Sequence, residues 1–315
     1  MLEWSAAYPG ADSAKQQLQK TLSTQSGDLK GFTLDSVTVD GDKATVLATA
    51  EMIGVDSKTG KVKGATDRMN RVFHLVREKD ASWKIVDYKG AEEELAAEIA
   101  ASKTDSERKA LLEAHKDLFG VKLDRALIAE GVHLAMRAAF TEARAIFELV
   151  QGLAMKVNDR SGLAAALQDA GNIDSNQGRY HQAMEGYLKS LSIREEIGDK
   201  SAIARSLWSI GSAYDDQGDY SNALDYYQKS LNTLRETGDE AAVAGLLANI
   251  GIVEWHQGDY SAALQNEEKS FEISEKLGDR MLAGKTLMNL GIIQAVRGNY
   301  LQALTFFQKS LAIKE

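Results

Sequence analysis

The chain has 315 residues, 44% hydrophobic and 26% charged, and a formal net charge of −9. No apolar run approaches the roughly 18 residues that predict a membrane span, so we expect a soluble protein without membrane insertion. The acidic balance, without clustered Lys and Arg, argues against nucleic acid as a partner. The absence of cysteine excludes disulfides and thiol chemistry but leaves the compartment open, cytoplasmic or, after removal of a signal peptide, extracytoplasmic.

The pattern of apolar residues in 1–90 is typical of a small α+β module. An amphipathic helix is expected over 13–22, and apolar residues then alternate at Ala44, Val46 and Ala48, which is strand period. Turn signals separate four expected strands near 32–39, 43–54, 66–77 and 83–88. The sequence therefore predicts an N-terminal α+β domain containing an antiparallel sheet.

The closing strand WKIVDY at 83–88 and the acidic helix after it resemble the latter part of nuclear transport factor 2-like domains. The resemblance implies a curved sheet that wraps a helix into a cone, here incomplete because the opening helix is missing. Some members of that superfamily are isomerases or dehydratases that use a pocket Asp or His. The available groups are Asp35, Asp67, His74 and Asp87, but outward polar residues are the rule on a half-buried sheet, so no enzyme is expected.

Residues 91–119 are rich in Ala, Glu and Lys and form a helical connector. Thr104 predicts that a new helix begins there. Leu95 and Ile99 are expected on the buried face of the preceding helix and Glu94 on its solvent-exposed face. The connector either covers the first repeat as a cap or is a solvated linker.

From residue 120 onward the chain repeats every forty residues. The repeated positions are glycines, a tyrosine and an alanine: Gly171, Gly211, Gly251 and Gly291; Gly178, Gly218, Gly258 and Gly298; Tyr180, Tyr220, Tyr260 and Tyr300; Ala183, Ala223, Ala263 and Ala303. Fixed spacing of this kind is typical of repeat architectures. The units expected are 120–158, 159–198, 199–238, 239–278 and 279–315, the first of them degenerate.

Each unit reads as two helices. Ile203, Leu207, Ile210 and Tyr214 mark an apolar stripe along the first helix of one unit, and Gly218 with Asp219 would end that helix and cap the next. The expected fold class is mainly α: a right-handed α-solenoid of about five helical hairpins, preceded by the α+β module.

The stretch LxxIGxxYxxxGDYxxALxYYxxSL at 207–231 resembles the tetratricopeptide repeat in a forty-residue form. The resemblance implies a superhelix whose concave surface binds a peptide or protein segment. Two departures stand in the fourth unit, where Glu254 and Glu267 replace Tyr214 and Tyr227; they are expected to weaken its internal packing.

Carrying over the groove positions of the family residue by residue gives a set of amide, aromatic and charged candidates. They are Asn172, Asn176, Arg205, Trp208, Asp215, Asn249, Trp255, His256, Lys285 and Asn289. The resemblance implies that Asn249 and Asn289 hold a peptide backbone and that Arg205 and Lys285 hold acidic groups. The amide ladder is incomplete, because Asp169 and Ser209 stand at the equivalent positions.

No nucleotide-binding, hydrolase or metalloprotease motif is present, and the five histidines are scattered, so no catalytic residue, metal or cofactor is expected. The leading hypothesis is an interaction scaffold. Similar arrays occur in bacterial proteins with a CHAT-type peptidase domain, so one alternative is a regulatory part of a larger enzyme. Small-molecule binding or isomerase activity in the N-terminal module is a second. The uncapped last repeat also suggests end-to-end self-association.

Overall fold

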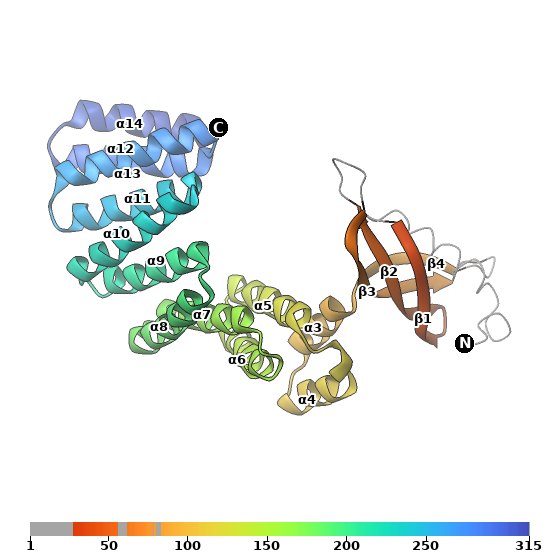
Figure 1. Ribbon diagram of the computed structural model, residues 1–315. Helices are drawn as coiled ribbons and strands as arrows, with labels where there is room; N and C mark the ends of the chain where they lie inside the picture. Colours follow the sequence, from red (N-terminus) through yellow and green to blue (C-terminus); the bar gives the residue numbers. More distant parts are fainter. Residues whose placement is uncertain (1–27, 56–61, 78, 80–82, 315) are drawn as a thin grey trace. The chain divides into compact units, whose positions relative to one another are not determined.

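The computed structural model describes residues 28–55, 62–77, 79 and 83–314 (Figure 1). The chain forms two compact units, Met1–Glu130 and Gly131–Glu315. Within the described residues, no helix combines the length and the apolar character needed to cross a membrane.

The first unit contains a four-stranded antiparallel sheet in the order β1 (Asp28–Asp40), β2 (Lys43–Val55), β3 (Val62–Arg77) and β4 (Trp83–Gly90) (Figure 1). The expected alternation is confirmed, since Ala44, Val46 and Ala48 are buried on β2, and Phe73 and Leu75 are buried on β3. The helix expected over 13–22 lies outside the described residues. The sheet thus has one face packed into a core.

Helix α3 (Ala91–Ala101) packs against β3 and β4 and is followed by α4 (Asp105–Ala114) and a 3₁₀ turn, η1 (Lys116–Leu118). Leu95 and Ile99 are buried as expected, and Thr104 caps α4 by accepting a hydrogen bond from the backbone N–H of Glu107. The expectation of a solvated Glu94 is wrong. This side chain is half-buried and lies 3.2 Å from His74 Nε2, because α3 turns it toward the sheet.

The second unit is an α-solenoid of helical hairpins (Figure 1). Helix α5 (Val121–Met136) crosses the boundary between the two units. The following helices are α6 (Phe140–Val157), α7 (Arg160–Asn176), α8 (Tyr180–Ile197), α9 (Lys200–Asp216), α10 (Tyr220–Thr237), α11 (Glu240–His256), α12 (Tyr260–Leu277), α13 (Arg280–Val296) and α14 (Tyr300–Lys314).

The turn chemistry expected from the sequence is confirmed. Gly218 has φ of 74°, a left-handed conformation that suits a residue without Cβ, and it separates α9 from α10. The side chain of Asp219 accepts a hydrogen bond from the N–H of Asn222 at 3.2 Å, which caps α10. Asp159, Asp199, Asp239, Asp259 and Asp279 cap their helices in the same way.

Within a hairpin, an aromatic ring of the second helix lies on a glycine of the first. A Cβ atom added to Gly171 would lie 2.8 Å from Tyr187 Cε1, and one on Gly291 would lie 2.5 Å from Phe307 Cε1. Gly131 with Phe147 and Gly211 with Tyr227 make the same contact. The repeated glycine therefore sets how closely the two helices approach.

A repeated serine joins the two helices in each of the last four hairpins. Ser230 Oγ donates a 2.7 Å hydrogen bond to the backbone carbonyl of Ala204, twenty-six residues earlier, and both groups are buried. Ser190, Ser270 and Ser310 make the equivalent 2.7 Å bonds. Sequence reasoning recorded the copied serine but gave it no role; its fixed spacing was the signal.

The fourth unit replaces one kind of contact by another. Tyr214 and Tyr226 stack in the third unit with ring centroids 5.6 Å apart, whereas Glu254 accepts a 2.8 Å hydrogen bond from Asn266 at the equivalent positions. Glu267, where the third unit has Tyr227, is fully buried. The substitutions at 254 and 266 therefore form a pair rather than two independent losses.

Candidate binding groove

A depression of about 740 Å³ lies along the first helices of two neighbouring hairpins. We call it the α7–α9 groove. It is lined by Ala165, Gln168, Asp169, Asn172, Ser175, Asn176, Tyr187, Arg194, Arg205, Trp208, Ser209, Ser212 and Asp216. Its volume falls within the range of roughly 300–1,000 Å³ common for ligand pockets. Four candidates from the sequence meet here: Asn172, Asn176, Arg205 and Trp208.

A chain of hydrogen bonds fixes the amide at the centre of the groove. Tyr187 Oη donates to Asn172 Oδ1 at 2.9 Å, and Asn172 Nδ2 donates to Asp169 Oδ1 at 3.2 Å. Burial raises the pKa of Tyr187 to about 12, so its phenol is neutral and acts as a donor. Burial also raises the pKa of Asp169, while Arg194 opposes that rise. Asn172 is thus held in one orientation, with its remaining amide hydrogen available to a ligand.

Arg194 is a buried cation in the wall of the groove, and sequence reasoning missed it. Its Nη1 donates to neutral acceptors, Ser206 Oγ at 2.7 Å, Ala202 O at 3.0 Å and Gln168 Oε1 at 3.2 Å. Burial lowers its pKa, and so does the nearby Arg205. The sequence did contain a clue, because Arg194 stands at the repeat position of Leu234, which is a buried apolar residue in the next repeat.

Trp208 bridges two hairpins. A Cβ on Gly245 of α11 would lie 3.0 Å from Trp208 Cη2, so the indole lies against the next first helix. The ring is partly buried and still lines the groove. Arg205, at the repeat position of Gly245, is exposed one helical turn before Trp208. The groove therefore combines an aromatic surface with a solvent-accessible guanidinium.

Three other candidates form a cluster that joins the third and fourth units. His256 Nδ1 lies 3.9 Å from Asp215 Oδ1, and the His256 ring lies 4.9 Å from the Trp255 ring and 5.4 Å from the Tyr220 ring. Burial raises the pKa of Asp215, and His256 opposes that rise. These side chains contact one another, so some of their polar atoms already interact within the cluster.

A smaller cavity lies between α11 and α13, and of the remaining candidates Asn289 lines it. This Glu267 pocket has a volume of about 150 Å³ and is lined by Gly251, Ile252, Trp255, Glu267, Asn289, Ile292 and Ile293. Asn289 Nδ2 donates to Glu267 Oε1 at 2.7 Å. Lys285 is exposed and its charge acts on Glu267. In the preceding repeat Asn249 interacts with Tyr227, and Tyr227 is the residue that corresponds to Glu267.

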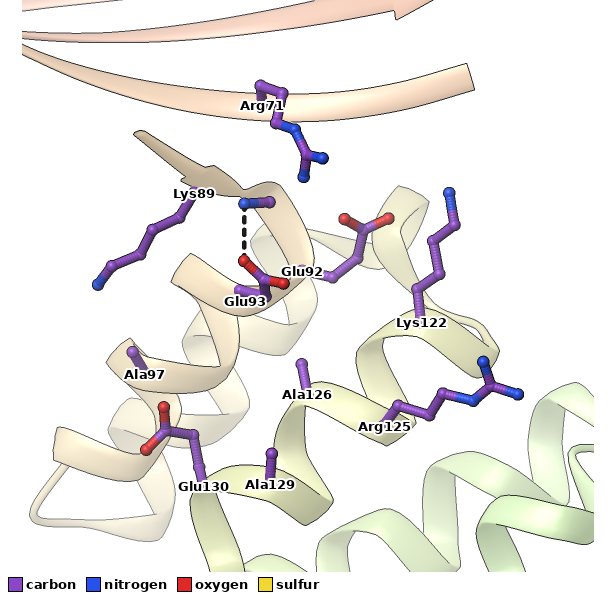
Figure 2. A pocket seen from close by; sticks show the side chains of 11 residues that line it. Arg71, Lys89, Glu92, Glu93, Ala97, Lys122, Arg125, Ala126, Ala129 and Glu130 are labelled. Atoms are coloured by element: carbon purple, nitrogen blue, oxygen red, sulfur yellow. Dashed lines mark hydrogen bonds between the residues drawn. The ribbon is translucent and has the colours of Figure 1, made fainter. Parts of the chain in front are cut away.

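The first unit has a pocket of its own, of about 700 Å³, which sequence reasoning did not predict (Figure 2). Arg71 of β3 reaches over the start of α3, and Lys122 and Arg125 come from α5. Glu93 is engaged there, since its Oε2 accepts a 3.0 Å hydrogen bond from Gly90 N. Acidic and basic groups alternate around this opening, so its charges do not point to one class of ligand.

Two of the groups named for the isomerase alternative, Asp35 and His74, do not line that pocket. Asp35 is exposed and accepts hydrogen bonds from Thr49 at 2.6 Å and from Thr33 at 3.2 Å. His74 pairs with Glu94. The side chains of Asp67 and Asp87 lie outside the described part of the chain. Across the described residues, no group of three or more His, Asp or Glu side chains could hold a metal ion.

The tetratricopeptide repeat family matches residues 162–236 and 242–315. The matched residues cover the hairpins from α7 to α14 and leave α5 and α6 outside. A comparison with curated protein sequences gives no match.

Solved structures share the fold at low sequence identity. BtubC from P. vanneervenii is 19% identical, with a TM-score of 0.59 over 72% of this chain and 92% of BtubC. RapI in its apo form is 22% identical, with a TM-score of 0.56 over 70% of this chain and 64% of RapI. The Rap conjugation gene regulator of plasmid pLS20, solved with the Phr* peptide, is 14% identical, with a TM-score of 0.53 over 68% and 57%. This chain thus spans less than two thirds of the length of either Rap protein.

Proposed function

We propose that this protein is an interaction scaffold that binds an extended peptide segment of a partner protein in the α7–α9 groove. The observation that carries the proposal is the composition of the groove. Residues that repeat every forty positions build turns and helix contacts, whereas the groove collects side chains that differ between repeats, among them Asn172, Arg205 and Trp208. The structure of a Rap protein with the Phr* peptide supports the same use of this fold.

Arg205 offers an exposed guanidinium to a carboxylate of the peptide. Asp169 and Asp216 also line the groove and balance its charge, so the carboxylate is expected at Arg205 rather than at the buried Arg194. The partly exposed indole of Trp208 offers area to an apolar side chain next to that carboxylate. Asn172 and Asn176 supply amides to the peptide backbone.

The test is a selection of peptides from a random display library on the full chain, followed by affinity measurement for the selected peptides. Arg205→Ala is expected to weaken binding by about tenfold or more, because a charge-assisted contact is lost. Trp208→Phe should weaken it less and should change the fluorescence response to the peptide.

The matched control is Lys189→Ala, which removes the same charge from the exposed surface of α8, where Lys189 pairs with Glu185. Its affinity for the selected peptides should equal that of the wild type. If Arg205→Ala and Lys189→Ala bind equally well, the groove is not the peptide site.

A further inference from the structure

The Glu267 pocket occupies the place of an aromatic ring. The equivalent residues Phe147, Tyr187, Tyr227 and Phe307 lie on the repeated glycine of their hairpins, whereas Gly251 faces Glu267, with Cγ 3.0 Å from an added Cβ. A carboxyl side chain is smaller than a ring, and about 150 Å³ is left open. That volume holds about five water-sized groups at roughly 30 Å³ each.

Glu267 lies at this pocket, and only one of its two carboxyl oxygens has a hydrogen-bond partner among the described residues. Glu267 is 0% exposed, its Oε1 accepts from Asn289, and its Oε2 is buried without a hydrogen-bond partner among the described residues. Burial raises the pKa of Glu267 to about 8, and Lys285 and Asn289 oppose that rise. A buried polar atom without a partner is uncommon in native structures and calls for an explanation.

The surrounding side chains select the chemistry of a ligand. Ile252, Ile292 and Ile293 provide apolar walls, and the ring of Trp255 provides a face that attracts cations. Asn289 uses its Nδ2 on Glu267, which leaves its Oδ1 as an acceptor. An aliphatic chain matches the apolar walls, and a positively charged hydrogen-bond donor at its end matches the two acceptors, the carboxyl oxygen of Glu267 and Oδ1 of Asn289.

We infer that the Glu267 pocket binds a primary ammonium group on a short aliphatic chain, with the charge paired to Glu267 and the methylenes against the isoleucines. A lysine side chain of a partner and a free alkylamine both carry this chemistry. The inference does not depend on the α7–α9 groove, whose residues are different.

Binding of an ammonium group requires the ionised form of Glu267, so it releases a proton wherever the acid is protonated beforehand. With a pKa of about 8, the affinity should rise by up to about tenfold per pH unit between pH 6 and 8. Lys285 on α13 is the charged group that acts on Glu267, and the titratable side chains of Glu254 and His256 flank Trp255 on α11. Comparison with Glu267→Gln separates the titration of Glu267 from theirs.

The experiment uses the full chain and three probes: n-butylamine, n-butanol and Nα-acetyl-lysine N-methylamide, followed by titration calorimetry and tryptophan fluorescence. The wild type should bind n-butylamine at least about ten times more tightly than the uncharged alcohol, and Glu267→Gln should remove that difference. Binding of both amine probes indicates that a free amine suffices. Binding of the lysine derivative alone assigns the site to a lysine on a peptide.

Two further variants separate binding from folding. Glu267→Tyr restores the ring of the other repeats and should close the pocket to every probe while the chain stays folded by circular dichroism. Lys285→Gln removes a cation that favours the ionised form of Glu267, so the pH dependence of amine binding should shift to higher pH, which a purely structural role for Glu267 does not explain. Equal affinity for n-butanol and n-butylamine, unchanged amine binding in Glu267→Gln, or no binding of either amine overturns the proposal.

Discussion

The ring of Tyr227 lies directly on Gly211, so close that a Cβ atom at Gly211 would be 2.6 Å from Tyr227 Cε1. Real Cβ atoms do not approach a ring carbon so closely, and the ring is fully buried. We expect Gly211→Ala to destabilise the protein by about 1–3 kcal/mol through overpacking. Chemical denaturation measures this change in the free energy of unfolding.

Gly251→Ala is the matched control for that experiment, since the same backbone position there faces the flexible side chain of Glu267, with Cγ at 3.0 Å. The carboxyl chain can move toward the open pocket, so the loss should be distinctly smaller than for Gly211→Ala. Equal losses at both positions would show that the contact of the ring is not what selects glycine.

Ala138 occupies a position that is glycine in the later repeats. Its φ of 60° is left-handed, as are those of Gly178, Gly218, Gly258 and Gly298. An L-residue with a Cβ pays about 1–2 kcal/mol for this conformation. We expect Ala138→Gly to stabilise the protein by about 1 kcal/mol, less the entropy that glycine gains in the unfolded chain.

The comparison is thermal unfolding of Ala138→Gly and of Ala129→Gly, a change at an exposed position in the middle of α5. The second change should destabilise by about 1 kcal/mol, because glycine is unfavourable within a helix. Destabilisation by both variants would contradict strain at Ala138.

The bond from Ser230 Oγ to the carbonyl of Ala204 lies wholly inside a hairpin. Ser230→Ala should cost about 0.5–1.5 kcal/mol, the usual net contribution of such a hydrogen bond. The exposed Ser221 on the same helix is the control, and Ser221→Ala should lie within about 0.5 kcal/mol of the wild type. Urea titrations of both variants measure the difference, and equal stability of the two would argue against a role for the buried bond.

Stability should depend on pH through Glu267. Its pKa of about 8 in the folded protein exceeds the ordinary value of 4.5, so the folded state keeps a proton that the unfolded state releases. The contribution of Glu267 is therefore complete below pH 4.5 and is lost as the pH rises toward 8, by about 1 kcal/mol per pH unit. Above pH 8 the loss levels off.

Glu267→Gln cannot ionise and keeps an oxygen for Asn289, so it isolates this effect from other titrating groups. The free energy of unfolding of the wild type minus that of Glu267→Gln should fall steadily from pH 5 to pH 8. A difference that stays constant over this range would show that Glu267 ionises at its ordinary pKa.

The sequence determined the scaffold because its information is local and periodic. A turn needs a residue that tolerates positive φ, a helix start needs a capping oxygen, and a core stripe needs apolar residues at helical spacing; Gly218, Asp219 and Leu207 meet these needs within one repeat. Four of the proposed groove residues also meet in one depression, because equal spacing along α7 and α9 places equivalent positions side by side.

Only the tertiary structure decided what happens between elements that the sequence keeps apart. It paired Glu254 with Asn266, turned Glu94 toward His74, placed Trp208 against Gly245, and left Glu267 in a pocket with an unpartnered oxygen among the described residues. The reason is physical. The period of a helix shows which face a residue is on, but the contents of a cavity depend on the volume and polarity of side chains from two or three helices together.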